Sequence, residues 1–118
     1  MNVVIFGTQK SRDTKKALRF FKERGIKPQF ADLSAHKTAP GELKRFVQKV
    51  GVDGLADTGG KAYKDAGLEY LKLSDEALLE RLLDNPALLK QPLIRSERTT
   101  EVGWNETLWR ELYAASKG

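Results

Sequence analysis

Residues 1–33 read MNVVIFGTQKSRDTKKALRFFKERGIKPQFADL and contain the signals of a strand, a helix and a second strand. Asn2 to Phe6 is almost entirely apolar and β-branched, which is typical of a strand buried on both faces. A helical stripe follows it, and Ile26 to Leu33 has the character of a second strand, which we expect to be parallel to the first. The β-α-β order in about 33 residues predicts a right-handed crossover unit.

The helix in this unit has recognisable ends. Ser11 and Asp13 are candidate N-caps, and Gly25 suits a left-handed C-cap. Between them, an apolar stripe at helical spacing predicts the buried face of the helix; it consists of Thr14, Ala17, Leu18 and Phe21.

The middle of the chain changes to helical patterns. Pro40 suits a helical first turn, and four apolar residues at helical spacing follow it before Gly51, at which we expect the helix to end; they are Leu43, Phe46, Val47 and Val50. Over residues 52–60 we expect short helical turns and a loop containing Gly59-Gly60. Ser74 is then a candidate N-cap for a helix with an inward-facing leucine set, Leu78, Leu79, Leu82 and Leu83.

The last third returns to strand signals. Leu93-Ile94 begins one strand and residues 99–104 make another, so an antiparallel hairpin with a turn at Glu97-Arg98 is predicted. Asn105 is a candidate cap for a final helix with Leu108, Trp109, Leu112 and Tyr113 on one face. The whole order predicts an α/β fold of thioredoxin-like type with a mixed sheet. We expect a single domain over residues 1–118, with 1–33 and 91–118 as its core and 34–90 as a helical insertion.

Composition limits the chemistry. The 118 residues are 40% hydrophobic and 31% charged, enough for one domain with a core. There is no cysteine, and His36 is the single histidine, expected at the surface. Disulfides, thiolate metal sites and thiol catalysis are therefore excluded, and we expect no metal and no cofactor. No apolar run approaches the ~20 residues of a membrane span, so a cytoplasmic protein is expected.

The net charge of +5 is unevenly distributed. Residues 1–50 hold 12 Lys/Arg and 4 Asp/Glu, whereas residues 51–118 hold 9 and 12. Basic residues at helical spacing in the first helix predict a positively charged face, made of Arg12, Lys15, Lys16 and Arg19. This face is either simply solvated or a surface for an acidic partner. No aromatic residues interleave with the charges, so nucleic acid is not expected as a direct ligand.

The loop from Thr8 to Asp13 precedes a helix N-terminus, where free N–H groups and the helix dipole favour an anion. Side chains of Lys10, Ser11 and Arg12 add donors. The alternative is that Thr8, Ser11 and Asp13 only satisfy the loop and the helix end, while the basic side chains are solvated.

The chain resembles the arsenate reductase-related (ArsC/Spx) family over nearly its whole length. The resemblance rests on the opening strand and its loop, on Thr14-Lys15-Lys16-Ala17, and on residues 85–94, NPALLKQPLI, which are similar to the family signature P-x-L-[IL]-x-R-P-[IL]. It implies a thioredoxin-like fold in which Pro92 is a cis-proline facing the loop.

The same resemblance exposes missing chemistry. Family members carry C-x-x-S-R-N-T or C-x-x-C-R-K, and the nucleophile position falls on Thr8 and the second thiol position on Ser11. An arginine that would hold the oxyanion falls on Gln91, and a second one falls near Gly59 or Gly60. A threonine hydroxyl is un-ionised at neutral pH and has no reversible oxidation chemistry. The sequence therefore predicts that thiol-dependent arsenate reduction is lost and that no residue is catalytic.

Two classes of function remain open. The first is a non-catalytic interaction or regulatory protein, with the basic face Arg12, Lys15, Lys16 and Arg19 as its partner surface; the Spx branch implies the C-terminal domain of the RNA polymerase α subunit as the partner. The second is a binder of a small anion or glutathione-like ligand, or an uncharacterised reductase-related enzyme, with the candidate anion site Thr8, Gln9, Lys10, Ser11, Arg12 and Gln91. A third, more remote possibility is a thiol transferase that uses a cysteine of its partner.

Overall fold

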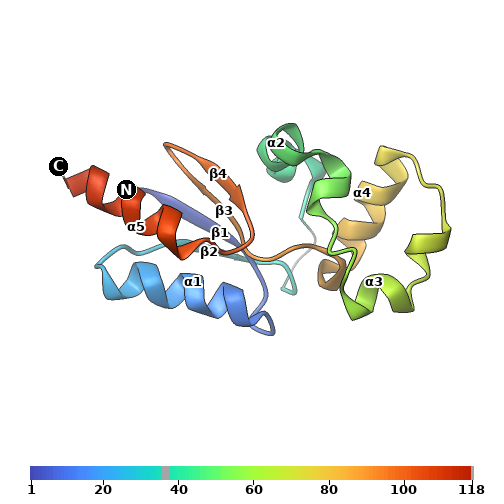
Figure 1. The fold of residues 1–118 in the computed structure, drawn as a ribbon, viewed down its shortest axis with the longest axis horizontal. Helices are drawn as coiled ribbons and strands as arrows, with labels where there is room; N and C mark the ends of the chain where they lie inside the picture. Colours follow the sequence, from blue (N-terminus) through green and yellow to red (C-terminus); the bar gives the residue numbers. More distant parts are fainter. Residues whose placement is uncertain (36–37, 118) are drawn as a thin grey trace. The chain divides into compact units, whose positions relative to one another are not determined.

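The structure is a computed structural model that describes residues 1–35 and 38–117, so the expected surface position of His36 lies outside the described residues. The chain divides into two compact units. One contains Met1–Asp32 together with the residues from Gln91 onward, and the other is Leu33–Lys90. Figure 1 shows the course of the chain through both units.

The first unit is built on a four-stranded sheet in the order β2-β1-β3-β4. The strands are β1 (Val3–Gly7), β2 (Gln29–Asp32), β3 (Leu93–Ser96) and β4 (Thr100–Val102). β1 pairs with β2 in parallel and with β3 antiparallel, and β3 and β4 form the predicted hairpin. The register places Ile5 between Phe30 and Ile94. The predicted mixed α/β architecture and parallel first pair are confirmed.

Two helices, α1 (Arg12–Glu23) and α5 (Glu106–Lys117), pack on the sheet through one shared core (Figure 1). The core residues are Val3, Ile5, Ala17, Phe20, Phe21, Ile94 and Trp109. Trp109 is fully buried, as expected, and contacts the Phe21 ring edge-on. The predicted α1 stripe is confirmed, with Leu18 half-buried against the core, but the prediction missed Phe20, which is also buried. Phe20 is drawn inward because its ring also packs edge-on against Trp104.

The ends of α1 explain its length and that of β2. Ser11 is the N-cap, so the alternative cap Asp13 is wrong; Asp13 lies inside the first turn. Gly25 adopts φ 73°, the left-handed conformation expected after the helix. The N–H of Ile26 donates to the Phe21 carbonyl at 2.9 Å. Ile26 therefore still completes the helix end, which is why β2 starts at Gln29, later than predicted.

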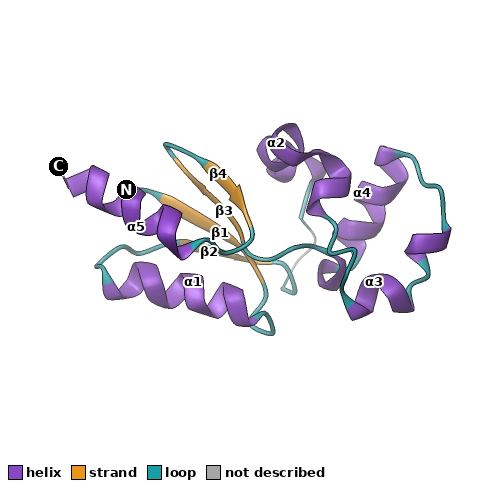
Figure 2. Cartoon of the chain, viewed as in Figure 1, coloured by secondary structure: helices purple, strands orange, loops and turns teal. Residues whose placement is uncertain are grey.

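The second unit consists of helices and turns in its described residues (Figure 2). Its α-helices are α2 (Lys44–Leu55), α3 (Lys61–Asp65) and α4 (Asp75–Asp84), and three short 3-10 helices, Pro40–Leu43, Leu68–Tyr70 and Pro86–Leu88, accompany them. Pro40 occupies a helical first turn and Ser74 caps α4, as predicted. Leu78, Leu82 and Leu83 are buried, whereas Leu79 is half-buried. The Gly59-Gly60 pair lies in a turn.

The prediction that the first helical stretch ends at Gly51 is confirmed. Gly51 has the non-helical angles φ 75° and ψ 168°, and a second short helical stretch, counted in α2, follows this kink to Leu55. Val52 and Leu55 are buried, whereas Val50, expected inside, is 39% exposed. Val50 lies over Gly54, where an added Cβ would come within 2.6 Å of it. Within the described part of the chain, every helix falls short of the length and apolar character needed to cross a bilayer.

Candidate functional site

The loop between β1 and α1 is a tight turn held by its own backbone. The Ser11 N–H donates to the Thr8 carbonyl at 3.1 Å. The Ser11 hydroxyl oxygen accepts from the Thr14 N–H at 3.2 Å, and the Ser11 carbonyl accepts from Lys15. The Ser11 hydroxyl thus satisfies the Thr14 N–H, which has no partner inside the helix, while the Ser11 carbonyl accepts the first regular helical bond, from Lys15. Its side chain is a helix cap in this structure.

Thr8 and Gln91 meet across 83 positions of the sequence. The Thr8 N–H donates to Gln91 Oε1 at 2.8 Å, and the Thr8 hydroxyl donates to the same oxygen at 3.2 Å. Both residues are half-buried. The next peptide bond, Gln91–Pro92, is cis, at the position where the resemblance implies a cis-proline. An internal carboxamide oxygen therefore accepts both donors that Thr8 presents.

Close packing fixes the loop from the β1 side. Gly7 is buried, and a Cβ added there would lie 2.5 Å from Thr14 Oγ1 and 2.7 Å from its Cγ2. Thr14 is fully buried, and its hydroxyl oxygen has no hydrogen-bond partner among the described residues. The last residue of β1 can approach α1 this closely because it has no side chain.

The rest of the candidate anion site is open to solvent. Gln9, Lys10 and Arg12 are exposed, so the structure brings together only part of the expected set, Thr8 with Gln91 and Ser11 with the helix end. Gly60, near which a family arginine falls, belongs to the second unit and donates its N–H to the Asp57 carbonyl. Over residues 1–35 and 38–117 there is no group of three or more His, Cys, Asp or Glu side chains able to hold a metal ion.

The predicted basic face is present on α1. Arg12, Lys15, Lys16 and Arg19 are all exposed. Lys16 lies 4.0 Å from Asp13 in a pair that is more than half exposed, and such a pair contributes little. The side chains of the other three make no hydrogen bond or ion pair with any residue that the structure describes. Among the described residues, Asp13 is therefore the only ion-pair partner of this face, and most of its charge is unpaired.

The carboxyl group of Glu97, in the hairpin turn and outside the β1–α1 loop, has a shifted pKa. The Asn2 N–H donates to Glu97 Oε2 at 2.7 Å, and this bond, with a smaller contribution from its own backbone N–H, lowers the pKa of the exposed Glu97 carboxyl. The N-terminal charge and Arg98 act in the same direction.

Sequence reasoning placed Thr8 and Gln91 in one candidate site but missed the bond between them. It also gave Thr14 a role in the stripe of α1 and missed its packing against Gly7. The sequence did contain a signal for the Thr8–Gln91 bond. An arginine side chain only donates hydrogen bonds, whereas the glutamine in its place can also accept them.

Comparison with known proteins places this geometry in a family. Residues 6–112 match the ArsC family. The global transcriptional regulator Spx 2 of Oceanobacillus iheyensis is 31% identical over 108 residues, covering 90% of this chain and 79% of that protein. The arsenate reductase of Neisseria meningitidis serogroup A is 29% identical over 104 residues, covering 86% and 89%.

Solved structures of similar proteins have the same fold as this chain. The arsenate reductase of Vibrio cholerae superposes with a TM-score of 0.74 at 27% identity, covering 87% of this chain and 90% of that one. An arsenate reductase (ArsC) related protein of Brucella melitensis gives a TM-score of 0.69 at 21% identity, covering 96% and 95%. These likenesses confirm the predicted thioredoxin-like fold. With the family match over most of its length and a cysteine-free sequence, the chain belongs to the ArsC family as a member that lacks the catalytic cysteine.

Proposed function

We propose that this protein is a non-catalytic member of the ArsC family that acts by binding a protein partner. The observation that carries the proposal is the pair of hydrogen bonds from Thr8 to Gln91 Oε1. The resemblance implies a thiol nucleophile and an arginine that holds an oxyanion. At these two positions this chain has Thr8 and Gln91, whose side chains are hydrogen-bonded to each other.

The missing thiol removes the reaction chemistry. Reduction of arsenate by a thiol needs a thiolate that forms an adduct and then passes it to a second thiol. Ser11 stands at the second thiol position, and its hydroxyl is occupied in capping α1. No sulfur other than that of Met1 is present in the chain.

The partner surface is the basic face of α1, Arg12, Lys15, Lys16 and Arg19. Relatives of this chain include proteins named as global transcriptional regulators, and the resemblance to the Spx branch suggests the C-terminal domain of the RNA polymerase α subunit. The exposed and mostly unpaired positive charges support an acidic protein surface as the partner, because complementary charge speeds and orients association.

Binding to the purified α-subunit domain, measured by isothermal titration calorimetry, tests this function. Reversal of the whole face to glutamate should abolish binding. The matched control reverses four exposed lysines of the second unit, Lys61, Lys64, Lys72 and Lys90. It changes the net charge equally but leaves the basic face intact, so it should retain binding. No binding by the unmodified protein, or equal loss in both variants, would contradict the proposal. Arsenate reduction with glutathione should not exceed that of Thr8→Ala.

The second candidate function is a small-anion or glutathione-like binder at the β1–α1 loop. The exposed Lys10 and Arg12 beside the N-terminus of α1 favour it. Thermal shift with arsenate, phosphate, sulfate and glutathione tests it, since a ligand at 100 times its Kd adds ~2.7 kcal/mol of stability. Unchanged melting with all four compounds would exclude this candidate.

A further inference from the structure

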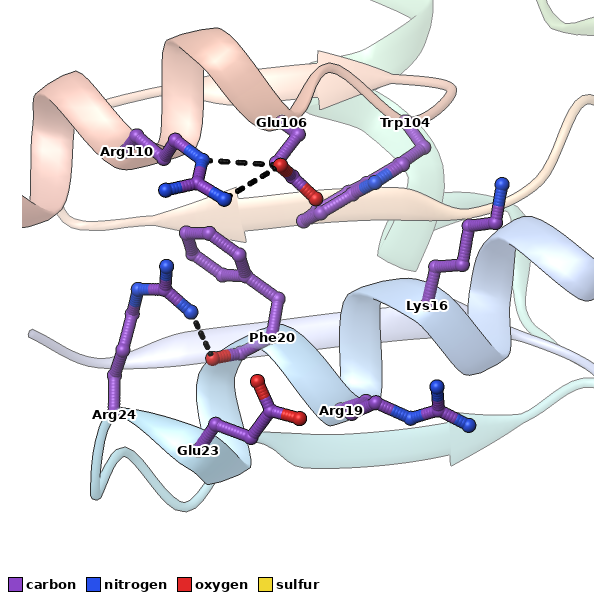
Figure 3. A pocket seen from close by; sticks show the side chains of 8 residues that line it. All are labelled: Lys16, Arg19, Phe20, Glu23, Arg24, Trp104, Glu106 and Arg110. Atoms are coloured by element: carbon purple, nitrogen blue, oxygen red, sulfur yellow. Dashed lines mark hydrogen bonds and ion pairs between the residues drawn. The ribbon is translucent and has the colours of Figure 1, made fainter.

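A groove in the first unit lies away from the β1–α1 loop. It has a volume of about 590 Å³ and runs between α1 and the segment that joins β4 to the first turns of α5 (Figure 3). Phe20 and Trp104 form its aromatic part, with ring centroids 5.3 Å apart and planes at 69°. Phe20 is buried, whereas Trp104 is half-buried, so the indole ring is the aromatic surface that a ligand can reach.

Basic side chains surround these rings. Arg24 lies over the Phe20 ring at 3.6 Å from its centroid and donates to the Phe20 carbonyl at 3.0 Å. Arg110 donates twice to Glu106 Oε2, at 2.9 and 3.0 Å. Figure 3 shows both arginines held in these positions. The Arg24 guanidinium is thereby oriented before any ligand arrives, which lowers the conformational entropy lost on binding. The Arg110–Glu106 pair is more than half exposed, and such a pair contributes little.

Two further cations at the groove are not fixed in this way. The side chain of Lys16 has only its loose pair with Asp13, and the side chain of Arg19 makes no hydrogen bond or ion pair with any described residue. The lining contains four cations against two carboxylates, Glu23 and Glu106, and one of these carboxylates is already bonded to Arg110. The groove therefore keeps an excess of positive charge at Lys16 and Arg19.

We propose that this groove binds an acidic peptide segment of a protein partner, with an apolar side chain against Trp104 and carboxylates at Lys16 and Arg19. This inference rests on the proposed function, because it specifies which part of the α1 surface recognises the partner. Arginine and tryptophan in a partly desolvated pocket are the residue types that dominate binding energy at protein interfaces.

The lining favours a peptide over a nucleic acid. Glu23 and Glu106 lie in the groove with the cations and would repel a phosphate backbone. Arg24 covers a face of the Phe20 ring, so that face is not free to stack on a base. An acidic peptide places its carboxylates at intervals and can leave an uncharged side chain near the glutamates.

The two tryptophans provide the test, because Trp104 lines the groove while Trp109 is fully buried in the core. The ¹⁵N-labelled protein is titrated with a capped nonapeptide of Asp and Glu around one central leucine. A peptide with lysine at every acidic position and an eight-nucleotide oligothymidylate are the comparison ligands. The acidic peptide should shift the Trp104 indole resonance saturably and leave that of Trp109 in place.

Variants then locate the contact. Arg19→Glu should raise the Kd of the acidic peptide about tenfold or more, because it removes an attraction and adds a repulsion. Lys22→Glu makes the same change of sign on the same helix, outside both the basic face and the groove lining, and should change the Kd less than threefold. Trp104→Ala should also weaken binding, with the Trp109 resonance showing that the core is intact.

Four results would overturn the groove assignment: no shift at Trp104, equal binding of the lysine peptide, tighter binding of the oligonucleotide, or equal effects of Arg19→Glu and Lys22→Glu. If the α-subunit domain binds through the basic face but is unaffected by Trp104→Ala, the proposed function stands and the groove assignment fails. If that domain fails to bind while the peptide shifts Trp104, the groove assignment stands and the proposed partner fails.

Discussion

Replacement of Gly7 by alanine should destabilise the first unit through a single collision. The new Cβ would lie 2.5 Å from Thr14 Oγ1 and 2.7 Å from Cγ2, and Thr14 is fully buried, so it has no open space into which to rotate. Overpacking of this kind costs about 1–3 kcal/mol. At this chain length, about 4 °C of Tm corresponds to 1 kcal/mol, so Gly7→Ala should lower Tm by roughly 4–12 °C.

A double-mutant cycle with Thr14→Ala separates this collision from other effects. Thr14→Ala removes a methyl group worth about 1 kcal/mol, but also a buried hydroxyl without a described partner, whose burial costs about 1–3 kcal/mol. The single variant should therefore be as stable as the wild type or up to about 2 kcal/mol more stable. In the double variant the closest remaining approach is 3.2 Å, to Thr14 Cβ, so it should be at least ~1 kcal/mol more stable than the sum of the singles predicts.

Tryptophan fluorescence during thermal unfolding is the appropriate assay, since Trp104 and Trp109 both belong to the first unit. Gly59→Ala serves as the control, because no atom lies within 4 Å of its added Cβ. A Gly7→Ala protein that melts with the wild type, or strict additivity in the double variant, would refute the packing argument.

Further predictions concern the loop and the hairpin turn. Ser11→Ala should cost about 1 kcal/mol in denaturant unfolding, while Ser11→Thr retains most of the cap. Gln91→Ala should cost about 1–2 kcal/mol through the two lost Thr8 bonds, and an equal loss in Gln91→Glu, which keeps an acceptor oxygen, would argue against their importance. The pKa of Glu97 is lowered in the folded state, so its contribution exists above the ordinary pKa of glutamate and is lost as pH falls through the lowered value. The Tm advantage over Glu97→Gln should therefore be larger at about pH 7 than at about pH 3, and a constant difference would contradict the assignment.

Local signals predicted most of the fold. The buried strand of residues 3–7, the left-handed Gly25 and the three caps Ser11, Ser74 and Asn105 depend on neighbouring residues, and the structure has each of them. The predictions failed where one backbone angle changed a periodic pattern. Val50 continues the apolar spacing of α2 but is 39% exposed, because it is the last residue before Gly51, where the positive φ interrupts the helix and its periodic pattern.

The site was less predictable because its contacts are remote in sequence. Thr8 and Gln91 could be assigned to one site by resemblance, but the choice between an open anion pocket and an internal bond depends on side-chain geometry. The groove combines residues of α1 with Trp104 and Arg110, which a linear scan places in separate helical and strand patterns. Charge periodicity identified Lys16 and Arg19 but gave no information on Trp104, which lines the same groove.

The Gln91 carboxamide oxygen also competes with any external ligand for the two Thr8 donors. Gln91 Oε1 is an acceptor attached to the same molecule, so it is present at the loop at a fixed effective concentration, whatever the solution contains. An anion that needs the Thr8 donors must first displace it. If the two bonds together contribute about 1–2 kcal/mol, the apparent affinity of such an anion falls roughly 5- to 30-fold below its intrinsic value. Binding of arsenate, phosphate or sulfate to the Thr8 donors would then be weakened by occupancy, without any steric barrier at the loop.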